Sequence, residues 1–333
     1  MNNSLEIAIE LGEMCREIKS KVRTFLDNIE SDSVKLIDIV KFIENQITQK
    51  FRENSKNNNI AFPVGVGVNN VCAHDTCYSD SDDRRFNLNL DLIKIDFGIQ
   101  KDGIIIDNAF TYSRNINDTN LVNVSKYIVD KVIKNIKKDS VICDIQSLAD
   151  RSLNEFNREN NTNFVAVSNL AGHQIKRNLI HADENQLIYP NNLVNKNESL
   201  IQGDSFYAIE FFISDGSNKF PDMVVENITH FMVKPNKLKK LEKMDIYNKP
   251  FDNIRIIILE YFGTLPFCQR FIQERINVST AEIDEFLNYL FQIGVINEYP
   301  AIIDNNSPHV KVSQHEETIY VPSDLSQNVV VLS

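Results

Sequence analysis

Four carboxylates and one imidazole carry the chemistry that this sequence suggests, and they are Asp96, Asp107, His173, Glu210 and Glu316. Oxygen-rich ligation with one nitrogen favours Mn, Fe, Co or Zn. Bridging carboxylates can hold two such ions about 3.5–4 Å apart around a shared, acidified water. The set therefore predicts a site for two divalent metal ions, provided that the fold brings these distant residues together.

Asp96 and Asp107 belong to an expected β-hairpin over residues 92–112. Ile, Phe and Tyr dominate both arms, and Asp102-Gly103 supplies the two residues that most readily take positive φ in a type I′ turn. Asp96 then faces Ala109, which makes the two aspartates diagonal neighbours on one face, about 7–8 Å apart between backbones. Two like charges there repel unless a cation lies between them. A solvated hairpin face is the alternative that these two residues alone leave open.

Each of the other candidate ligands has an ordinary structural alternative. His173 follows a glycine, as many loop histidines do, and Glu210 lies in an apolar run where a salt bridge could satisfy it. An unpaired carboxylate in such a run is strongly disfavoured, so burial of Glu210 requires a cation. Glu316 adds a fourth carboxylate, and the five residues together favour a metal centre.

Composition indicates an ordinary globular protein. The chain has 333 residues, of which 42% are hydrophobic, enough for a sizeable core. No apolar run approaches the roughly 18 residues that span a bilayer, and the N-terminus lacks the pattern of a signal peptide. We therefore expect a cytoplasmic protein with no membrane partner. A net charge of −11 argues against specific DNA binding, and the five scattered cysteines are predicted to be reduced and structural.

Hydrophobic spacing predicts the helices that position these residues. Apolar side chains at steps of three or four indicate amphipathic helices over 5–29, 36–51, 121–136 and 144–156. The polar run Glu53–Asn59 ends the second helix. A strand, a histidine and an acidic hairpin follow the first helix pair, and a similar unit, with Glu210 before Asp215-Gly216, follows the second. This repeat predicts two related halves with the site between them.

Residues 236–299 are predicted to form an inserted helical subdomain, with helical segments at Ile254–Phe262, Phe267–Glu274 and Ala281–Ile293. Its eight Lys or Arg nearly balance its nine Asp or Glu. A winged fold that reads DNA is therefore poorly supported. The chain then ends in two expected extended segments, His309–Ser313 and Thr318–Pro322, with Gln314-His315-Glu316-Glu317 between them.

Several short motifs occur in order along almost the whole chain. They are Ala61-Phe62-Pro63, Asn69-Asn70, Ala73-His74, Lys94-Ile95-Asp96-Phe97-Gly98, Ile105-Ile106-Asp107-Asn108-Ala109-Phe110, Gly172-His173, Ile180-His181-Ala182, Ala208-Ile209-Glu210 and Gln314-His315-Glu316-Glu317-Thr318. Together they resemble the type 2 methionine aminopeptidases. Residues 262–268 and 294–300 also match the helical insertion that marks type 2.

The resemblance implies an α+β pita-bread fold, in which a curved, mainly antiparallel sheet carries outer helices and a winged-helix-like helical insertion. Residues 1–235 and 300–333 would form the catalytic domain and residues 236–299 the insertion. The implied activity is removal of the N-terminal methionine from nascent proteins and peptides by attack of a metal-activated hydroxide. The partners would be the N-termini of nascent polypeptides, with ribosome association left open, and the protein would be a monomer.

The resemblance also implies roles for the ligands. Asp96 would bind the first metal ion, Asp107 and Glu316 would bridge both ions, and His173 with Glu210 would complete the second site. Glu210 would also shuttle the proton.

Further residues would handle the substrate. His181 would stabilise the substrate carbonyl or tetrahedral intermediate, His74 would contact the peptide beyond its first residue, and His230 would lie near the methionine pocket. An unbranched thioether needs a narrow apolar slot. Its residues would be Phe62, Ile180 and Tyr299, with Pro266 nearby.

The chain departs from the family pattern at Asp75, Cys77, Lys176, Phe211 and Glu317, and none of these replaces a metal ligand. We expect them to alter the surroundings of the ligands and the mouth of the cleft. Two alternatives stay open beside the aminopeptidase. One is a relative that has lost catalysis and serves as an RNA- or protein-binding module, and the other is a prolidase-like peptidase on the same fold.

Overall fold

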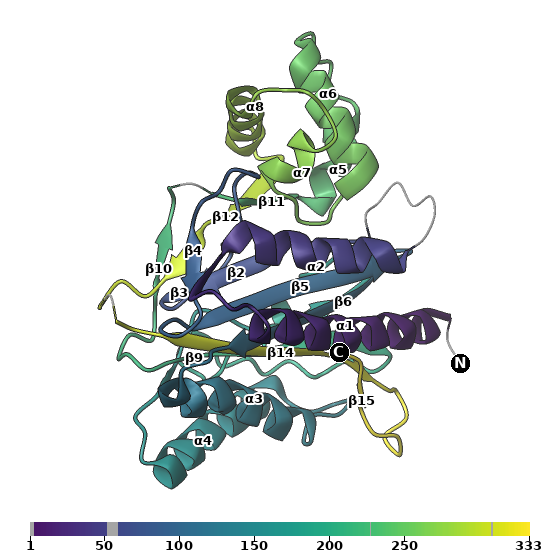
Figure 1. Ribbon diagram of the computed structural model, residues 1–333. Helices are drawn as coiled ribbons and strands as arrows, with labels where there is room; N and C mark the ends of the chain where they lie inside the picture. The colour runs from purple at the N-terminus through teal and green to yellow at the C-terminus, as the bar shows by residue number, and fades with distance from the viewer. Residues whose placement is uncertain (1–2, 52–58, 227, 308) are drawn as a thin grey trace.

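The computed structural model describes residues 3–51, 59–226, 228–307 and 309–333 (Figure 1). Its central element is an eight-stranded sheet with the order β2-β5-β6-β14-β9-β7, in which β8 also pairs with β9 and β15 with β14. The strands are β2 (Gly65–Val68), β5 (Ile93–Lys101), β6 (Ile104–Tyr112), β7 (Val165–Ala166), β8 (His173–Ile175), β9 (Ser205–Ser214), β14 (Val312–Val321) and β15 (Val330–Val331). Every strand pair in the sheet is antiparallel. This confirms the predicted α+β class with an antiparallel sheet.

The hairpin of β5 and β6 forms as predicted. Asp102 and Gly103 both have positive φ, 53° and 76°, as a type I′ turn requires. The register pairs Asp96 with Ala109. The two aspartates therefore share one face of the hairpin.

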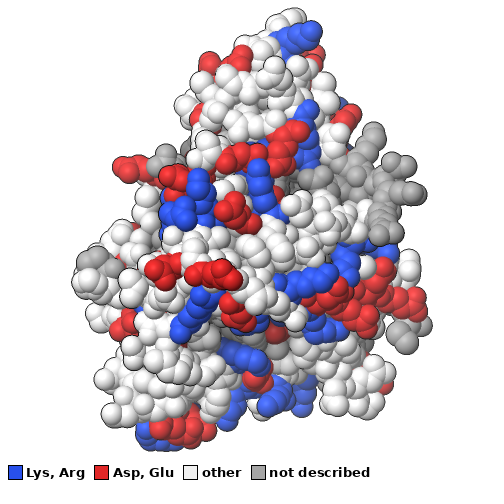
Figure 2. Space-filling model, in the orientation of Figure 1, with Lys and Arg blue, Asp and Glu red and all other residues white. Residues whose placement is uncertain are grey.

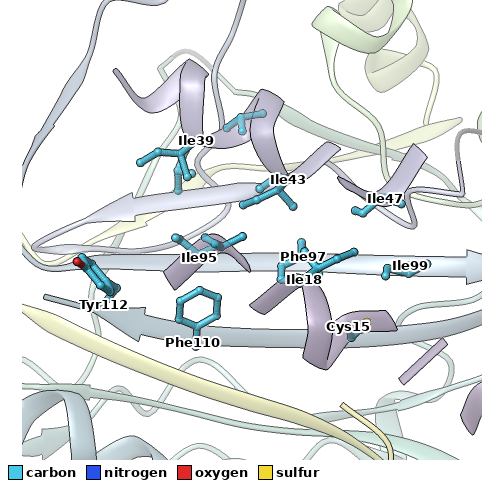
Figure 3. Close-up of a cluster of buried hydrophobic side chains, with 14 of the residues drawn as sticks. Cys15, Ile18, Ile39, Ile43, Ile47, Ile95, Phe97, Ile99, Phe110 and Tyr112 are labelled. Atoms are coloured by element: carbon cyan, nitrogen blue, oxygen red, sulfur yellow. The ribbon is translucent and has the colours of Figure 1, made fainter. Parts of the chain in front are cut away.

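Two helix pairs cover one face of the sheet, one pair on each half. The helices are α1 (Asn3–Asp27), α2 (Leu36–Lys50), α3 (Thr119–Ile133) and α4 (Ile142–Asn160). Figure 3 shows side chains of α1 and α2 packed on alternate residues of β5, including Ile95, Phe97 and Ile99. A second buried cluster joins α3 and α4 to β9 and β14. Because strand side chains alternate, the residues between these, Asp96 among them, face the other side.

The repeat prediction is correct for the helices and wrong for the second hairpin. β9 does not fold back over Asp215-Gly216, because its partner along its full length is β14, from a distant part of the chain. The predicted division of the C-terminal strand is also wrong, since β14 runs without interruption through Gln314 and Glu317. Pairing with β9 on one side and β6 on the other lets the polar residues of β14 continue the strand. Residues 53–58 of the polar run after α2 lie outside the described residues.

Smaller sheets border the central one. β3 (Val71–Ala73), β13 (Ala301–Ile303) and β10 (Asp222–Val224) form one sheet, with β10 at its edge. β1 (Ser33–Lys35) pairs with β4 (Arg85–Asn87), and β11 (His230–Val233) pairs with β12 (Ile296–Tyr299). Short 3₁₀ turns lie at Ile116–Asp118, Glu184–Gln186 and Pro235–Lys237.

The helices after β11 form a separate group above the sheet (Figure 1). They are α5 (Leu238–Glu242), α6 (Lys249–Ile257) continued by the π-helical segment Ile258–Phe262, α7 (Gln269–Gln273) and α8 (Thr280–Gln292). Their buried cluster includes Phe231 and Val233 of β11. The division of the chain at residues 235 and 300 stays a prediction.

Several predictions from composition can be compared with the structure. The five cysteines are free and buried. Among the described residues, the helices are too short or too polar to cross a bilayer. On the face drawn in Figure 2, Lys and Arg are interspersed with Asp and Glu rather than gathered in one basic patch.

Candidate active site

Three of the predicted ligands lie in one row across four neighbouring strands. The register pairs Asp96 of β5 with Ala109 of β6, Ala109 with Glu316 of β14, and Glu316 with Glu210 of β9. Residues in register on antiparallel strands point to the same face. The three carboxylates therefore converge on the face of the sheet opposite the helices.

The other two ligands lie in a parallel row, two residues along the strands. Asp107 precedes Ala109 by two positions, and His173 of β8 pairs with Ala208, which precedes Glu210 by two. The period of two keeps both side chains on the same face as the first row. Nε2 of His173 is 3.5 Å from Oδ2 of Asp107. All five predicted ligands line one pocket.

The donor atoms fit a cation. Asp107, His173 and Glu316 are 1–4% exposed, and one ligand atom from each lies within 4.8 Å of the others. In the described structure, four buried polar atoms of the predicted ligands have no hydrogen-bond partner, namely Oδ1 of Asp96, Oδ1 of Asp107, Nδ1 of His173 and Oε1 of Glu316. Unsatisfied buried polar atoms are costly, and a coordinated ion would satisfy them.

The electrostatics of the cluster point the same way. Burial raises the pKa of Asp96 to about 7, and burial with the neighbouring carboxylates raises the pKa values of Asp107 and Glu316 well above the usual range. Burial also raises the pKa of Glu210 and lowers that of His173 well below its usual value. Burial therefore favours the protonated forms of these carboxyl groups, whereas divalent ions would stabilise the carboxylate forms.

Gln314 supports the first row and was not predicted to do so. Its Nε2 donates to Oδ2 of Asp96 at 3.2 Å and to Oε2 of Glu210 at 3.3 Å. The amide thus connects two ligands that come from strands three positions apart in the sheet. The available signal was its place two residues before Glu316, which puts both on one face of a strand.

Three histidines surround the cluster. The rings of His74 and His230 are 6.1 Å apart, and the ring of His181 lies 4.3 Å from that of His173. Nδ1 of His74 is 3.3 Å from the carbonyl oxygen of Pro300. A carbonyl can only accept, so Nδ1 carries the hydrogen and Nε2 has a free lone pair. Burial lowers the pKa values of His74 and His230, the latter to about 3, so both are neutral.

The predicted methionine pocket residues line the same cavity. Phe62, Ile180, Pro266 and Tyr299 form an apolar wall next to the ligands. Gly98 makes room for this wall, because a Cβ there would lie 2.3 Å from the Phe62 ring. The cavity also has lining residues that we did not predict, among them Leu170 and Phe212. Phe212 follows Glu210 by two residues, so strand alternation could have found it.

Two of the five departures face away from the pocket, contrary to our expectation. Phe211 packs in the cluster under α3 and α4. Glu317 lies beside Lys19 and His315, with nitrogen to oxygen distances of 3.3 and 3.1 Å. Asp75 is held by Arg84 at 2.9 Å, Cys77 is buried, and Lys176 is exposed. None of the five lines the pocket in the described part of the chain.

Comparison with known proteins agrees with this arrangement. A sequence profile of metallopeptidase family M24 matches residues 8–231. The chain belongs to metallopeptidase family M24. Methionine aminopeptidase 2 of Encephalitozoon hellem is 30% identical to it over 95% of this chain and 84% of its own length. This confirms the resemblance to the type 2 methionine aminopeptidases.

Solved structures show that this M24 chain has the fold of its family. A methionine aminopeptidase from Thermotoga maritima has a TM-score of 0.59 at 14% identity, covering 100% of this chain and 97% of that one. A thermophilic Arx1 has a TM-score of 0.74 at 16% identity, covering 98% of this chain and 90% of that one. At such identities the likeness is one of fold alone. The predicted pita-bread fold is confirmed.

Proposed function

We propose that the chain is a methionyl aminopeptidase that uses two divalent metal ions to remove the N-terminal methionine from nascent proteins and peptides. The observation that carries the proposal is the convergence of Asp96, Asp107, His173, Glu210 and Glu316 on one pocket with unsatisfied donor atoms. The name of the Encephalitozoon relative supports the choice of methionine as the residue removed.

The five ligands would hold the ions, with Asp107 and Glu316 as the bridging pair. When bound, the ions would supply an acidified water and polarise the scissile carbonyl. Mn, Fe, Co and Zn all suit four carboxylates and one imidazole.

The chain's own residues would position the substrate. The apolar wall of Phe62, Ile180 and Tyr299 would hold the methionine side chain and exclude water from it. His181, which lines the pocket, would donate a hydrogen bond to the scissile carbonyl. Nε2 of His74 would accept one from the peptide N–H that follows.

Glu210 would move the proton. Its carboxylate would take up the proton that the attacking water releases and pass it to the departing amine. The hydrogen bond from Gln314 to Oε2 fixes the orientation of that carboxyl group.

One assay tests the proposal. The purified protein is stripped with a chelator, reloaded with Mn, Fe, Co or Zn, and tested on Met-Ala-Ser, with Leu-Ala-Ser as the control. We expect release of the N-terminal residue from Met-Ala-Ser but not from Leu-Ala-Ser, and only after reloading. Failure of every metal-loaded sample, with the metals bound, would overturn the proposal.

That negative result would favour the binding-module alternative. The likeness to Arx1 does not decide between the two functions, because it is one of fold alone. Preferential release of residues that precede proline would favour the prolidase-like alternative. A cytoplasmic location and a monomeric state stay predictions, and ribosome association stays open.

A further inference from the structure

We propose that the substrate chain, after its first few residues, lies on an apolar surface at the edge strand β10. We call this the exit surface and define it as Leu170, Met223 and Val225. The inference rests on the proposed function, because it assigns a site to the part of the polypeptide that the catalytic pocket does not hold.

The register of the three-stranded sheet connects the pocket to the exit surface. Ala73 of β3 lines the pocket. It pairs with Ile302 of β13, which pairs in turn with Met223 of β10. Paired residues on antiparallel strands share a face. Met223 therefore lies on the same face of this sheet as a residue of the pocket, and Figure 1 shows β3 and β10 on the same side of the molecule.

A loop contact makes the second connection. Leu170 lines the pocket, and its neighbour Asn169 donates from Nδ2 to the carbonyl oxygen of Pro221 at 3.1 Å. Pro221 directly precedes β10. Leu170 also packs against the buried cluster that contains Ile302. The rim of the pocket and the start of β10 are therefore in contact.

Two large apolar side chains at β10 are exposed to solvent. Met223 is 66% exposed and Val225 is 72% exposed, although both are large and apolar. Met223 is the middle residue of β10 and Val225 directly follows the strand, so the two lie close together at this edge of the sheet. Exposed apolar side chains that continue a ligand pocket are typical of a binding surface.

The dimensions suit the fourth to sixth residues of a substrate. Adjacent strands are about 4.8 Å apart, so Met223 is about 10 Å from Ala73 across the sheet. An extended chain covers that distance in about three residues. A peptide whose first residue fills the methionine pocket would therefore reach Met223 with its fourth or fifth residue.

The chemistry of the surface predicts a preference. Met223 and Val225 would contact apolar side chains, and Met can adapt to different shapes. The neighbouring Asp222 and Glu226 are exposed carboxylates, so acidic residues at these substrate positions would be repelled. The enzyme should favour chains with apolar rather than acidic residues at positions four to six.

The test compares three substrates, Met-Ala-Ser, Met-Ala-Ser-Leu-Val-Leu and Met-Ala-Ser-Asp-Ser-Asp, on the metal-loaded enzyme. The altered protein carries Met223→Asp with Val225→Asp. The matched control carries Leu193→Asp with Val194→Asp, an exposed apolar pair outside the residues that line the pocket. We expect wild type and control to cleave the apolar hexapeptide with kcat/KM about tenfold above that for the tripeptide, chiefly through KM.

In the β10 variant that advantage should disappear, while cleavage of Met-Ala-Ser stays unchanged. An equal advantage in all three proteins, or an equal loss in variant and control, would overturn the inference. Fluorescence anisotropy of a labelled apolar hexapeptide with chelator present separates the two proposals. Suppose that the metal-loaded wild type cleaves none of the three peptides, but that the hexapeptide binds more weakly to the β10 variant than to wild type and control. The exit surface would then be supported and the peptidase function rejected.

Discussion

The Nε2 atom of His173 lies 3.5 Å from the Oδ2 atom of Asp107. This exceeds the usual hydrogen-bond distance of about 2.7–3.2 Å. Burial lowers the pKa of the imidazole and raises that of the carboxyl group, so the two do not form an ordinary ion pair. Both atoms can instead bind a common cation, and that relationship motivates the first prediction.

Asp107→Ala should abolish methionine release and lower the bound metal from two ions per chain to one or none, because the proposed bridging carboxylate touches both ions. Metal analysis and the peptide assay on the same sample measure this. Asp150→Ala, which removes an exposed carboxylate of α4, is the control and should change neither quantity. Two bound ions and normal turnover in Asp107→Ala would rule out the dinuclear assignment.

His74→Asn should keep both metal ions, reduce turnover by about 10- to 100-fold, and prevent covalent labelling by a spiro-epoxide of the fumagillin type. The reason is that Nε2 of His74 is unprotonated and outside the ligand set. His173→Asn, by contrast, should lose metal first. Intact mass and metal analysis distinguish the two variants, and stoichiometric labelling of His74→Asn would show that His74 has the wrong role.

Gln314→Ala should weaken metal binding by about 10- to 100-fold, the usual effect of removing a group that orients ligands. Its amide holds Asp96 and Glu210 at hydrogen-bond distance. Gln314→Asn is the conservative comparison. Its amide is one carbon shorter and should not reach both carboxylates, so we expect a similar loss of metal affinity. Isothermal titration calorimetry with Mn²⁺ measures the affinity. Unchanged affinity in Gln314→Ala would contradict the proposal that Gln314 orients the two ligands.

Stabilisation by added metal should grow as pH rises. A carboxyl group whose pKa is raised in the folded, metal-free chain stabilises the fold below its unfolded pKa of about 4 and loses that contribution as pH rises through the folded pKa. For Asp96 the folded pKa is about 7, and the pKa values of Asp107, Glu210 and Glu316 are raised as well. Bound ions would remove this loss.

Calorimetric Tm values at pH 5.5 and 7.5, with and without Mn²⁺, test the pH prediction. The gain in Tm on adding metal should be larger at pH 7.5. Asp107→Ala serves as the control, because its gain should be small at both pH values. An equal gain for the wild type at the two pH values would count against proton and metal competition at this cluster.

Arg270→Met should destabilise the protein by about 3–5 kcal/mol, because it leaves Glu44 buried without its partner. Arg270 is 1% exposed, and its guanidinium contacts Glu44 of α2 through both Nη atoms and Glu274 at 2.8 Å. The double variant Glu44→Met with Arg270→Met should recover most of the loss. Denaturant unfolding measures all three free energies, and a double variant as unstable as the single one would contradict this account.

The sequence predicted those parts of the site that depend on local pattern. The turn at Asp102-Gly103 fixes the register of one hairpin, and that register places Asp96 and Asp107 on one face. Strand alternation could also have placed Phe211 and Glu317 on the outer face. The pairing of β14 with β9 was not predictable in this way, because it joins residues about a hundred positions apart and no turn sets its register.

The ion pair of Arg270 and Glu44 was equally hidden from the sequence. Each residue has an oppositely charged neighbour within four positions. Local pattern therefore predicts ion pairs within each helix rather than with a partner 226 positions away. The pair forms only because the fold brings Arg270 of α7 beside Glu44 of α2. The exit surface was not predictable from the sequence either, because Met223 and Ala73 are placed on one sheet only by their common partner Ile302 of β13.

The position of β14 has a consequence for synthesis of the protein. This strand lies between β6 and β9 and carries Glu316, so the two halves of the sheet stay unjoined until residues 312–321 have been made. A partly translated chain therefore lacks Glu316, one of the five proposed metal ligands. Under the proposed function, the activity of a newly made copy would begin only after β14 has paired with both β6 and β9.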